Sequence, residues 1–454
     1  MPIRPCAATE PVVKTLACLL AAPLLAVSAQ AADLLQVYRA AQDSDPTYAA
    51  ARATLEAGRE KLPQGLSGLL PSLTLSADRS RNDSKMTVHG AAANTYQQNY
   101  NANGYQLNLS QPLFRWQNWV AYDQAKFQVA QAEANFAQAR QDLILRVAQA
   151  YFDILNAREN LSAVRANKEA IGQQLEAAKK NFEVGSATIT DTHEAQSRYD
   201  LALAQEIAAE SDLEVKQNAL QAIIGRAPGH LAGLRRDAES RPPQPGDINQ
   251  WVSAAEKDSI AVQIQQAAAD IAEREVDRQR AGHYPTVDLV ANYSYGKTFY
   301  PGFGLLENDS RSVGVQLNVP LYLGGQVDSR QREASAGRAA SQAALEAARR
   351  AAALSARQQY LGVASGLAQV RALKAALLSS QSALESNKLG YDVGVRINID
   401  VLNAENQVYV TRRDLARATF DTLLAQLRLK SAVGALGEDD VLAINALLDP
   451  AAGQ

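Results

Sequence analysis

Residues 117–183 read QNWVAYDQAKFQVAQAEANFAQARQDLILRVAQAYFDILNARENLSAVRANKEAIGQQLEAAKKNFE, and an apolar residue recurs in this stretch at every seventh position. The repeat is unbroken at Tyr122, Val129, Phe136, Leu143, Ala150, Ala157, Val164, Ile171 and Ala178. A strict seven-residue apolar repeat predicts a helix that supercoils left-handedly against its neighbours. At 1.5 Å per residue this helix is roughly 100 Å long. It cannot bury its apolar seam alone, so it needs helical partners.

The sequence around this stretch occurs in a second, related copy. LPSLTLSAD at 70–78 is matched by YPTVDLVAN at 284–292, LNLSQPLF at 107–114 by QLNVPLY at 316–322, and AIIG at 222–225 by SAVG at 431–434. The heptads also return, at Val363, Val370, Leu377, Leu384 and Tyr391. We therefore expect an internal duplication. Its parts are a first repeat over 32–240, a proline-rich linker over 241–246, a second repeat over 247–435 and a C-terminal tail over 436–454.

Each copy also contains two stretches with the alternation of a β-strand. Between Thr286 and Tyr295, and again between Ser312 and Leu321, apolar residues occupy every second position. The segment from Tyr300 through Asp309 between them is expected to be a surface loop. In the first copy the alternation is clear at 73–77, but the Asn/Gln-rich stretch over 96–109 changes parity near Tyr100. Each copy is thus expected to read helix, strand, loop, strand, very long helix, short break, shorter helix.

The N-terminus is typical of a secretory signal. A positive segment with Arg4 and Lys14 precedes a short apolar run, and AQA at 29–31 is a small-x-small cleavage site. Residues 1–31 are therefore predicted to be removed, and with them Cys6 and Cys18, the only two cysteines. The mature chain then has no thiol chemistry. A transmembrane anchor is disfavoured because the run is too short, and a lipid anchor because the residues before Cys18 fit a lipidation box poorly.

Other features exclude several classes of function. The net charge of −3 and the lack of a Lys/Arg block argue against nucleic-acid binding. The four histidines, at 89, 193, 230 and 283, do not have metal-ligand spacing. No glycine-rich loop precedes a helix in the pattern that cradles phosphate. We expect no catalytic residues, no metal and no cofactor.

Strands with one apolar and one polar face fit a membrane barrel, with lipid outside and water inside. Four strands per chain cannot close a barrel, and an open edge in lipid leaves backbone groups unpaired. Closure requires several chains, and the residues alone allow a dimer or a trimer. An autotransporter or a soluble adhesin would mass its strands at one end of the chain. A soluble coiled-coil protein would leave the strands unexplained.

The duplicated pattern resembles the TolC family of outer-membrane efflux and export proteins over essentially the whole mature chain. The matching motifs are DPT at 45–47, QPLF at 111–114, VG at 184–185 with TD at 190–191 and Ala195, GY at 390–391 with VG at 393–394 and Arg396, DVLNA at 400–404, and EDDVLAIN at 438–445. The resemblance implies an α+β membrane protein that forms a homotrimer. Each chain gives four strands to a 12-stranded transmembrane β-barrel in the outer membrane, and this barrel is continuous with a long coiled-coil α-helical barrel that crosses the periplasm. It also implies an equatorial position for the C-terminal tail.

The resemblance further implies a passive exit duct of a tripartite export system, for type I protein secretion, multidrug efflux or both. Its partners are a periplasmic adaptor (membrane fusion) protein and an inner-membrane transporter of the ABC or RND type. The missing lipidation cysteine favours the general branch that also serves protein secretion. The alternative is a periplasmic structural coiled-coil protein without pore activity.

By the same resemblance, the breaks between long and short helices lie at the periplasmic entrance. Asp400 and Asn403 are three residues apart on one helix face and form the gate ring. The family pattern has acidic residues at both positions, so Asn403 implies a mouth that is less selective for cations. Tyr391 and Arg396 are expected to reach Thr190 and Asp191 and to latch the gate closed. Trp116 and Trp119 are expected to pack at the junction of barrel and helices rather than to form an interfacial aromatic belt.

Overall fold

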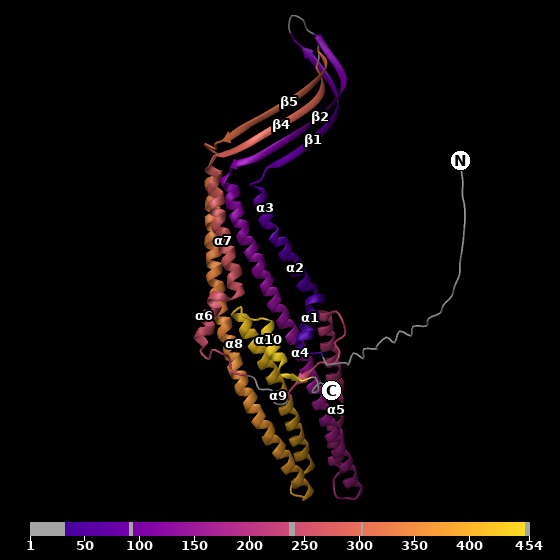
Figure 1. The fold of residues 1–454 in the computed structure, drawn as a ribbon. Coiled ribbons are helices and arrows are strands. Elements are labelled where there is room, and N and C mark those ends of the chain that lie inside the picture. The colour runs from indigo at the N-terminus through magenta and orange to yellow at the C-terminus, as the bar shows by residue number, and fades with distance from the viewer. Residues whose placement is uncertain (1–31, 90–93, 236–240, 301–302, 450–454) are drawn as a thin grey trace, which may run out of the picture.

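In the computed structural model, the described residues are 32–89, 94–235, 241–300 and 303–449. The expected signal segment, 1–31, lies outside them. A curved sheet stands at one end of an elongated molecule, and long helices run from the sheet to the opposite end (Figure 1). The α+β fold expected from the sequence is confirmed.

The same order of elements occurs in both halves of the chain. The first half contains α1 (Leu34–Ser44), α2 (Pro46–Arg59), α3 (Lys61–Ser67), β1 (Ser72–Val88), β2 (Asn94–Phe114), α4 (Trp116–Glu183) and α5 (Ile189–Ile224). The second half contains α6 (Ile248–Asp258), α7 (Ile260–Arg280), η1 (Ala281–His283), β4 (Thr286–Tyr300), β5 (Gly304–Asn318), α8 (Gln326–Asp392) and α9 (Asn398–Ala432). The short elements β3 (Gly233–Leu234), α10 (Glu438–Asn445) and β6 (Leu448–Asp449) lie near the middle. The internal duplication is therefore confirmed, while the domain boundaries drawn from it stay a prediction.

The long strands form one antiparallel sheet in the order β1-β2-β4-β5. β1 and β2 pair from Ser72↔Ser110 to Val88↔Asn94, and β4 and β5 from Thr286↔Asn318 to Tyr300↔Gly304. The two hairpins join through β2 and β4, which pair from Asn103↔Lys297 to Phe114↔Val287. In the described part of the chain, β1 and β5 each have one edge without a strand partner.

The expected loop between the last two strands is too long. Residues from Gly304 through Asp309 belong to β5 and pair with β4, so this strand begins at Gly304 rather than after Asp309. The sequence ENDS at 307–310 is polar at every position and so lacks the alternation by which the strand was sought. The uncertain Asn/Gln-rich strand of the first copy is also a strand, and its pairing with β1 is continuous.

The two faces of the sheet differ in polarity in the half nearest the helices. The register places apolar side chains on one face, namely Leu73, Leu75, Leu107, Leu109, Leu289, Val313, Val315 and Leu317. On β1 and β5 this face is open, since Leu73 is 65% exposed and Val313 is 78% exposed. The opposite face carries Thr74, Ser76, Gln106, Asn108, Ser312 and Gln316. An apolar face of this kind is stable only when something other than water covers it.

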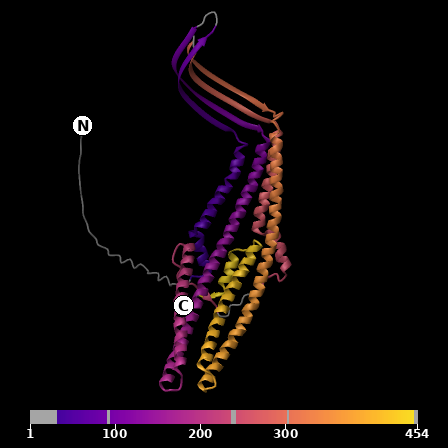
Figure 2. The ribbon, with the colours of Figure 1, turned by 180° about the vertical axis from the view of Figure 1, so that it is seen from behind.

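The long helices form a layer one helix thick. α4 packs against α5, α7 and α9, and α9 packs against α8. Away from the sheet the order is α5, α4, α9, α8, so that α5 and α8 are the edges (Figures 1 and 2). The predicted heptad seam of α4 faces these neighbours, because Leu143, Val164 and Ile171 are all buried.

Among the described residues, α8 alone has the length and composition that could cross a membrane, and only 6% of its apolar window is buried. Alanine and leucine on an open helix surface explain this result. Leu354, Leu361 and Leu378 of α8 are all more than half exposed. The apolar edge of the layer therefore lacks a cover within one chain.

Candidate functional site at the tips of the helical hairpins

Both helical hairpins end in the same backbone turn. Gly185 follows α4 and Gly394 follows α8, and each has φ of 77°, a left-handed conformation that costs any residue with a Cβ. The N–H of Gly185 donates to the carbonyl of Phe182, and the N–H of Gly394 donates to the carbonyl of Tyr391, both at 3.0 Å. The two tips lie side by side at the end of the molecule farthest from the sheet (Figures 1 and 2). The duplication has therefore preserved the turn geometry.

The first hairpin restarts its helix with a capping box. The backbone N–H and the hydroxyl of Thr188 donate to the Asp191 carboxylate at 2.9 and 2.8 Å. The N–H of Asp191 donates back to the Thr188 hydroxyl at 3.3 Å. This reciprocal arrangement satisfies backbone donors at the start of α5. The Asp191 carboxylate is thus occupied within its own helix.

The second hairpin has Ile397 at the position of Thr188, so the same box cannot form. No side chain caps the start of α9. The carboxylate of Asp400, which matches Asp191 in position, lies 3.6 Å from the Arg396 guanidinium instead. The Asp400 side chain is about one-third exposed, so it remains available to solvent or to another chain.

Near the tips, two described hydrogen bonds connect the hairpins within one chain. The amide of Asn181 in α4 donates to the Tyr391 hydroxyl at 3.2 Å. The guanidinium of Arg198 in α5 donates to the Asn403 amide oxygen at 3.3 Å. Asn181 and Arg198 were not among the residues expected from the sequence. A signal was available for Asn181, which stands three residues before Val184 in the VG pair that recurs in both turns.

The predicted latch residues have other partners in the single chain. Among the described contacts, Arg396 pairs with Asp400 and Asp191 bonds to Thr188, so neither reaches the other. Tyr391 bonds to Asn181 rather than to Thr190. The structure brings all of these residues to one end of the molecule, and their joint action as a latch stays a prediction.

Farther from the tips, a buried carboxylate in each hairpin forms ion pairs with the neighbouring helix. Glu206 of α5 accepts a hydrogen bond from Lys168 and one of 3.1 Å from Arg165. The hydrogen bond from Lys168, with help from Arg165, holds the pKa of Glu206 below its usual value. Glu405 of α9, only 6% exposed, has a single cationic partner, Lys388 at 3.0 Å. One of its carboxylate oxygens is buried and has no partner among the described atoms.

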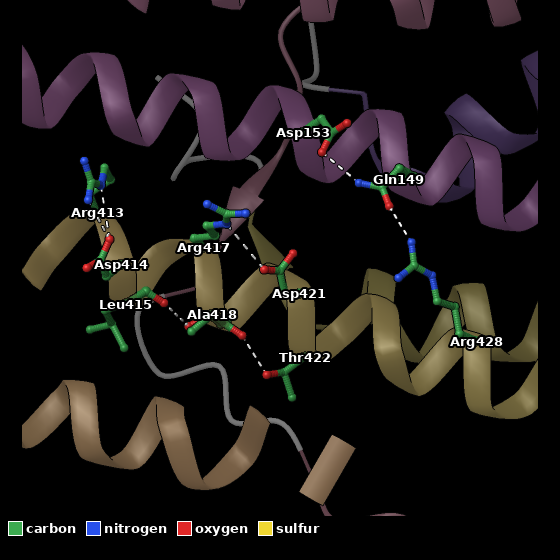
Figure 3. A network of polar contacts seen from close by, with 11 residues as sticks. Gln149, Asp153, Arg413, Asp414, Leu415, Arg417, Ala418, Asp421, Thr422 and Arg428 are labelled. Carbon is green, nitrogen blue, oxygen red and sulfur yellow. Dashed lines mark hydrogen bonds and ion pairs between the residues drawn. The ribbon is translucent and has the colours of Figure 1, made fainter. Parts of the chain in front are cut away.

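The two faces of α9 carry different chemistry. Figure 3 shows one face with a row of ion pairs, Arg413 with Asp414 at 2.9 Å and Arg417 with Asp421 at 3.6 Å. The row continues where Arg428 donates to Gln149 of α4 at 2.9 Å. A Cβ on Gly366 of α8 would lie 2.5 Å from the Thr422 hydroxyl, so only glycine permits this close approach of α8 to α9. This face of α9 is polar, and its positive and negative charges nearly cancel.

The other face of α9 lies toward the linker, where the amide of Gln426 donates to the carbonyl of Arg241 at 2.8 Å. Positions 412, 419 and 426 share this face because they are seven residues apart. A groove of about 540 Å³ opens here between α8 and α9. Its floor includes Leu367 and Phe420, and three of its cations have no ion-pair partner in the described part of the chain: Arg371, Lys374 and Arg412. The groove can therefore attract an anionic partner.

The described residues contain no group of three or more His, Cys, Asp or Glu side chains that could hold a metal ion. Trp116 and Trp119, at the start of α4, are 45% and 51% exposed in the single chain. Nearby, Arg115 forms a two-point ion pair with the buried Asp288 of β4, with both bonds at 2.7 Å. The junction of sheet and helices is therefore tied by a salt bridge.

The family model described as "Outer membrane efflux protein" matches residues 37–226 and 251–435. The chain is 34% identical to Outer membrane protein TolC of Vibrio cholerae, over 92% of this chain and 94% of the relative. It is 31% identical to the Proteases secretion protein PrtF of Dickeya chrysanthemi, over 92% of both chains. The solved structure of the outer membrane protein VceC from Vibrio cholerae superposes with a TM-score of 0.75 over 88% of this chain and 96% of that one, at 20% identity.

Proposed function

This chain belongs to the outer membrane efflux protein family, and from that premise we propose that three copies of it close a single duct through the outer membrane. The family is one of channels rather than enzymes. Relatives named for TolC and for protease secretion support an outer-membrane exit duct for type I secretion and efflux. The chain is accordingly an outer-membrane protein. The alternative, a periplasmic coiled coil without a pore, is not favoured.

The observation that carries the proposal is the open, two-faced sheet. An exposed edge in hydrocarbon leaves backbone N–H and C=O groups unpaired, at several kcal/mol each. Pairing β5 of one copy with β1 of the next removes every such edge. Three copies of four strands give a 12-stranded barrel, which lies within the range of known outer-membrane barrels. The face with Leu73 and Val313 then meets lipid.

The helix layer supports the same closure. Its edges are apolar and exposed, with Leu201, Ile207 and Val215 on α5 and Leu354, Leu361 and Leu378 on α8. When β5 of one copy joins β1 of the next, the α8 edge approaches the α5 edge of that copy. The short elements and the linker occupy one face of the layer and are assigned to the outside. The ion-pair row of α9 then lines the inside.

A gate at the hairpin tips forms part of the proposal. Three copies of Asp400 make one anionic ring at the periplasmic mouth, and Asn403 adds a neutral ring one turn farther along α9. One ring of carboxylates attracts cations less strongly than two. Strong cation selectivity that disappears in Asn403→Ala would contradict this assignment.

The latch is proposed to act between chains or during opening, through Tyr391 and Arg396 with Thr190 and Asp191. Ties of this kind are each worth about 0–1 kcal/mol when exposed, yet several of them bias a gate that opens at a cost of a few kcal/mol. Arg396→Ser should raise the conductance of single channels. An unchanged conductance would remove Arg396 from the latch.

A periplasmic adaptor and an inner-membrane ABC or RND transporter are the proposed partners. The relatives named for protease secretion support a transporter-driven pathway. The cationic groove on the outer face of α9 offers one contact for an adaptor with acidic side chains. Reversing its charges, as in Arg371→Glu with Lys374→Glu, should weaken co-purification of the adaptor without closing the pore.

The test of the whole proposal uses the protein extracted in detergent. It should run as a heat-resistant trimer and form pores in planar bilayers. A matched pair of variants probes the sheet: Val313→Arg places a charge on the lipid face at about 2–4 kcal/mol per chain, whereas the neighbouring Ser312→Arg points to water. Val313→Arg should reduce insertion and Ser312→Arg should not. A soluble monomer would overturn the proposal.

A further inference from the structure

The β1–β2 hairpin extends well past the region where the two hairpins pair. β2 stops pairing with β4 at Asn103↔Lys297, but β1 and β2 continue to Val88↔Asn94. The apolar face ends in a cluster of tyrosines, with the rings of Tyr105 and Tyr295 stacked at 5.1 Å. Beyond it, both faces of β1 and β2 are mainly polar. On the proposed orientation this distal part lies outside the membrane.

A pocket of about 300 Å³ lies in the distal part, between the two hairpins. It is lined by Ser84, Met86, Tyr96, Gln98, Tyr100, Thr298, Phe299 and Tyr300. The rings of Tyr100 and Phe299 are 5.8 Å apart and tilted by 36°. None of the lining residues carries a charge. The volume is at the lower limit of ligand pockets, and the lining combines aromatic rings with a few polar groups, as such pockets do.

One polar atom in this pocket has no partner. The amide oxygen of Gln98 is buried and accepts no hydrogen bond from any described atom. A buried acceptor left without a donor is unfavourable, because it has lost its hydrogen bond to water and gained none in the protein. The strand pairing alone does not explain this, because the cross-strand neighbour of Gln98 is Ser84, whose hydroxyl is not bonded to it. A ligand that donates a hydrogen bond would remove the cost.

We propose that this pocket binds a pyranose ring of a neutral saccharide. The C–H face of a pyranose is apolar and packs against aromatic rings, while its hydroxyls donate and accept at the ring edge. Tyr100, Phe299 and Tyr300 supply the rings, and the Gln98 amide oxygen accepts from a hydroxyl. The absence of charge in the lining selects a neutral sugar over a sugar acid or a phosphate.

The register places this site toward the lumen. Gln98 and Tyr100 are an even number of residues from Gln106 and Asn108, so they share the polar face of the sheet, opposite the lipid face, and Tyr300 has the same parity. Phe299 has the parity of Tyr295 on the other face, and its ring contacts Tyr100 beyond Asn103↔Lys297, where β2 and β4 no longer pair. A saccharide bound there narrows the outer mouth of the duct. This consequence rests on the proposed function, whereas binding itself does not require a pore.

Binding is tested first on the detergent-solubilised protein with maltotriose, by saturation-transfer NMR. Gln98→Leu and Tyr300→Ser should each weaken the apparent affinity at least about fivefold. Tyr322→Ser, which removes an exposed tyrosine outside the pocket, is the matched control and should change nothing. No saturable binding, or binding that both pocket variants leave intact, would overturn the inference.

The second measurement is single-channel current across a planar bilayer, with maltotriose added to the compartment that the sheet end of the duct faces. Saturable block that polyethylene glycol of equal mass does not reproduce supports the site. Equal block by both solutes, or variants that widen the pore without weakening block, would show a simple constriction and overturn it. A protein that binds maltotriose but forms no pore contradicts the proposed function alone. The binding measurement is repeated with lipopolysaccharide to identify the source of the sugar. Binding of maltotriose but not of lipopolysaccharide would indicate a free saccharide, as expected for a site that is reached only from the lumen.

Discussion

The two helical hairpins of this chain share a turn and differ in the residue that follows it. Thr188 and Asp191 close a capping box at the start of α5, whereas Ile397 leaves Asp400 without that role. The Asp400 carboxylate instead lies near Arg396 and is partly exposed. With Ile397 in place of a hydroxyl, the carboxylate that closes a capping box in the first hairpin is partly exposed in the second. The two copies share the backbone turn and differ in what the aspartate side chain contacts.

The largest difference in stability between the two hairpins should come from the ion pairs that join the two helices of each hairpin. Lys388→Met leaves Glu405 buried without a cation and should lower the free energy of local opening of α9 by about 1–3 kcal/mol. Lys168→Met leaves Arg165 with Glu206 and should cost clearly less, because this pair is open to solvent. Hydrogen exchange of the two helices measures both. Equal losses would mean that the number of partners does not matter here.

The turns themselves should respond alike. Gly185→Ala and Gly394→Ala each force a Cβ into a left-handed conformation and should cost about 1 kcal/mol. Hydrogen exchange at the two tips is again the measurement. A clear inequality would break the view that the hairpins share one turn.

The capping box can be moved between the hairpins. Thr188→Ala should destabilise the start of α5 by about 1 kcal/mol. Ile397→Thr should stabilise the start of α9 by about 0.5–1 kcal/mol and draw Asp400 away from Arg396. A structure of Ile397→Thr in which Asp400 still faces Arg396 would contradict this account.

Asp400 and Asp191 should differ in their effect on the ion selectivity of the pore, with almost no change in stability. Asp400→Asn should move the reversal potential in a salt gradient toward that of a non-selective pore. Asp191→Asn should shift the reversal potential less, because the N–H and hydroxyl of Thr188 point at that carboxylate and offset part of its charge. Equal shifts would place both carboxylates at the mouth.

Acid should loosen the first hairpin through Glu206. Its pKa is depressed by the hydrogen bond from Lys168, so the ionised folded form is favoured. This contribution is present above the unfolded pKa of about 4.3 and is lost as the pH falls through the folded value. The opening free energy of α5, taken from hydrogen exchange after division by the intrinsic exchange rate at each pH, should therefore be constant from pH 7 to pH 5 and fall at lower pH. In Glu206→Gln this fall should be smaller.

The sequence predicted those parts of the fold in which apolar residues recur at a regular spacing. The seven-residue spacing of Leu143, Ala150 and Ala157 required a long packed helix, and alternation around Val287 and Val313 required strands. The start of β5 escaped because residues that are polar on both sides of a strand show no alternation. The sequence therefore shows a strand only where its two faces differ in polarity.

The tip contacts were harder to predict for a different reason. The glycines and aspartates of the tips stood out because their turns recur. Which side chain meets which depends on how α4 and α5 sit against α8 and α9, and spacing along one helix does not contain that information. Asn181 and Arg198 became visible only when the hairpins were placed side by side.

A wall one helix thick presents every helix to two environments at once. Arg412, Thr419 and Gln426 look one way from α9, and Asp414, Asp421 and Arg428 look the other way. Substitutions on one side therefore do not disturb the other. In the proposed duct, substitutions on the inner face change what passes through and substitutions on the outer face change what binds there, so the two properties can evolve separately.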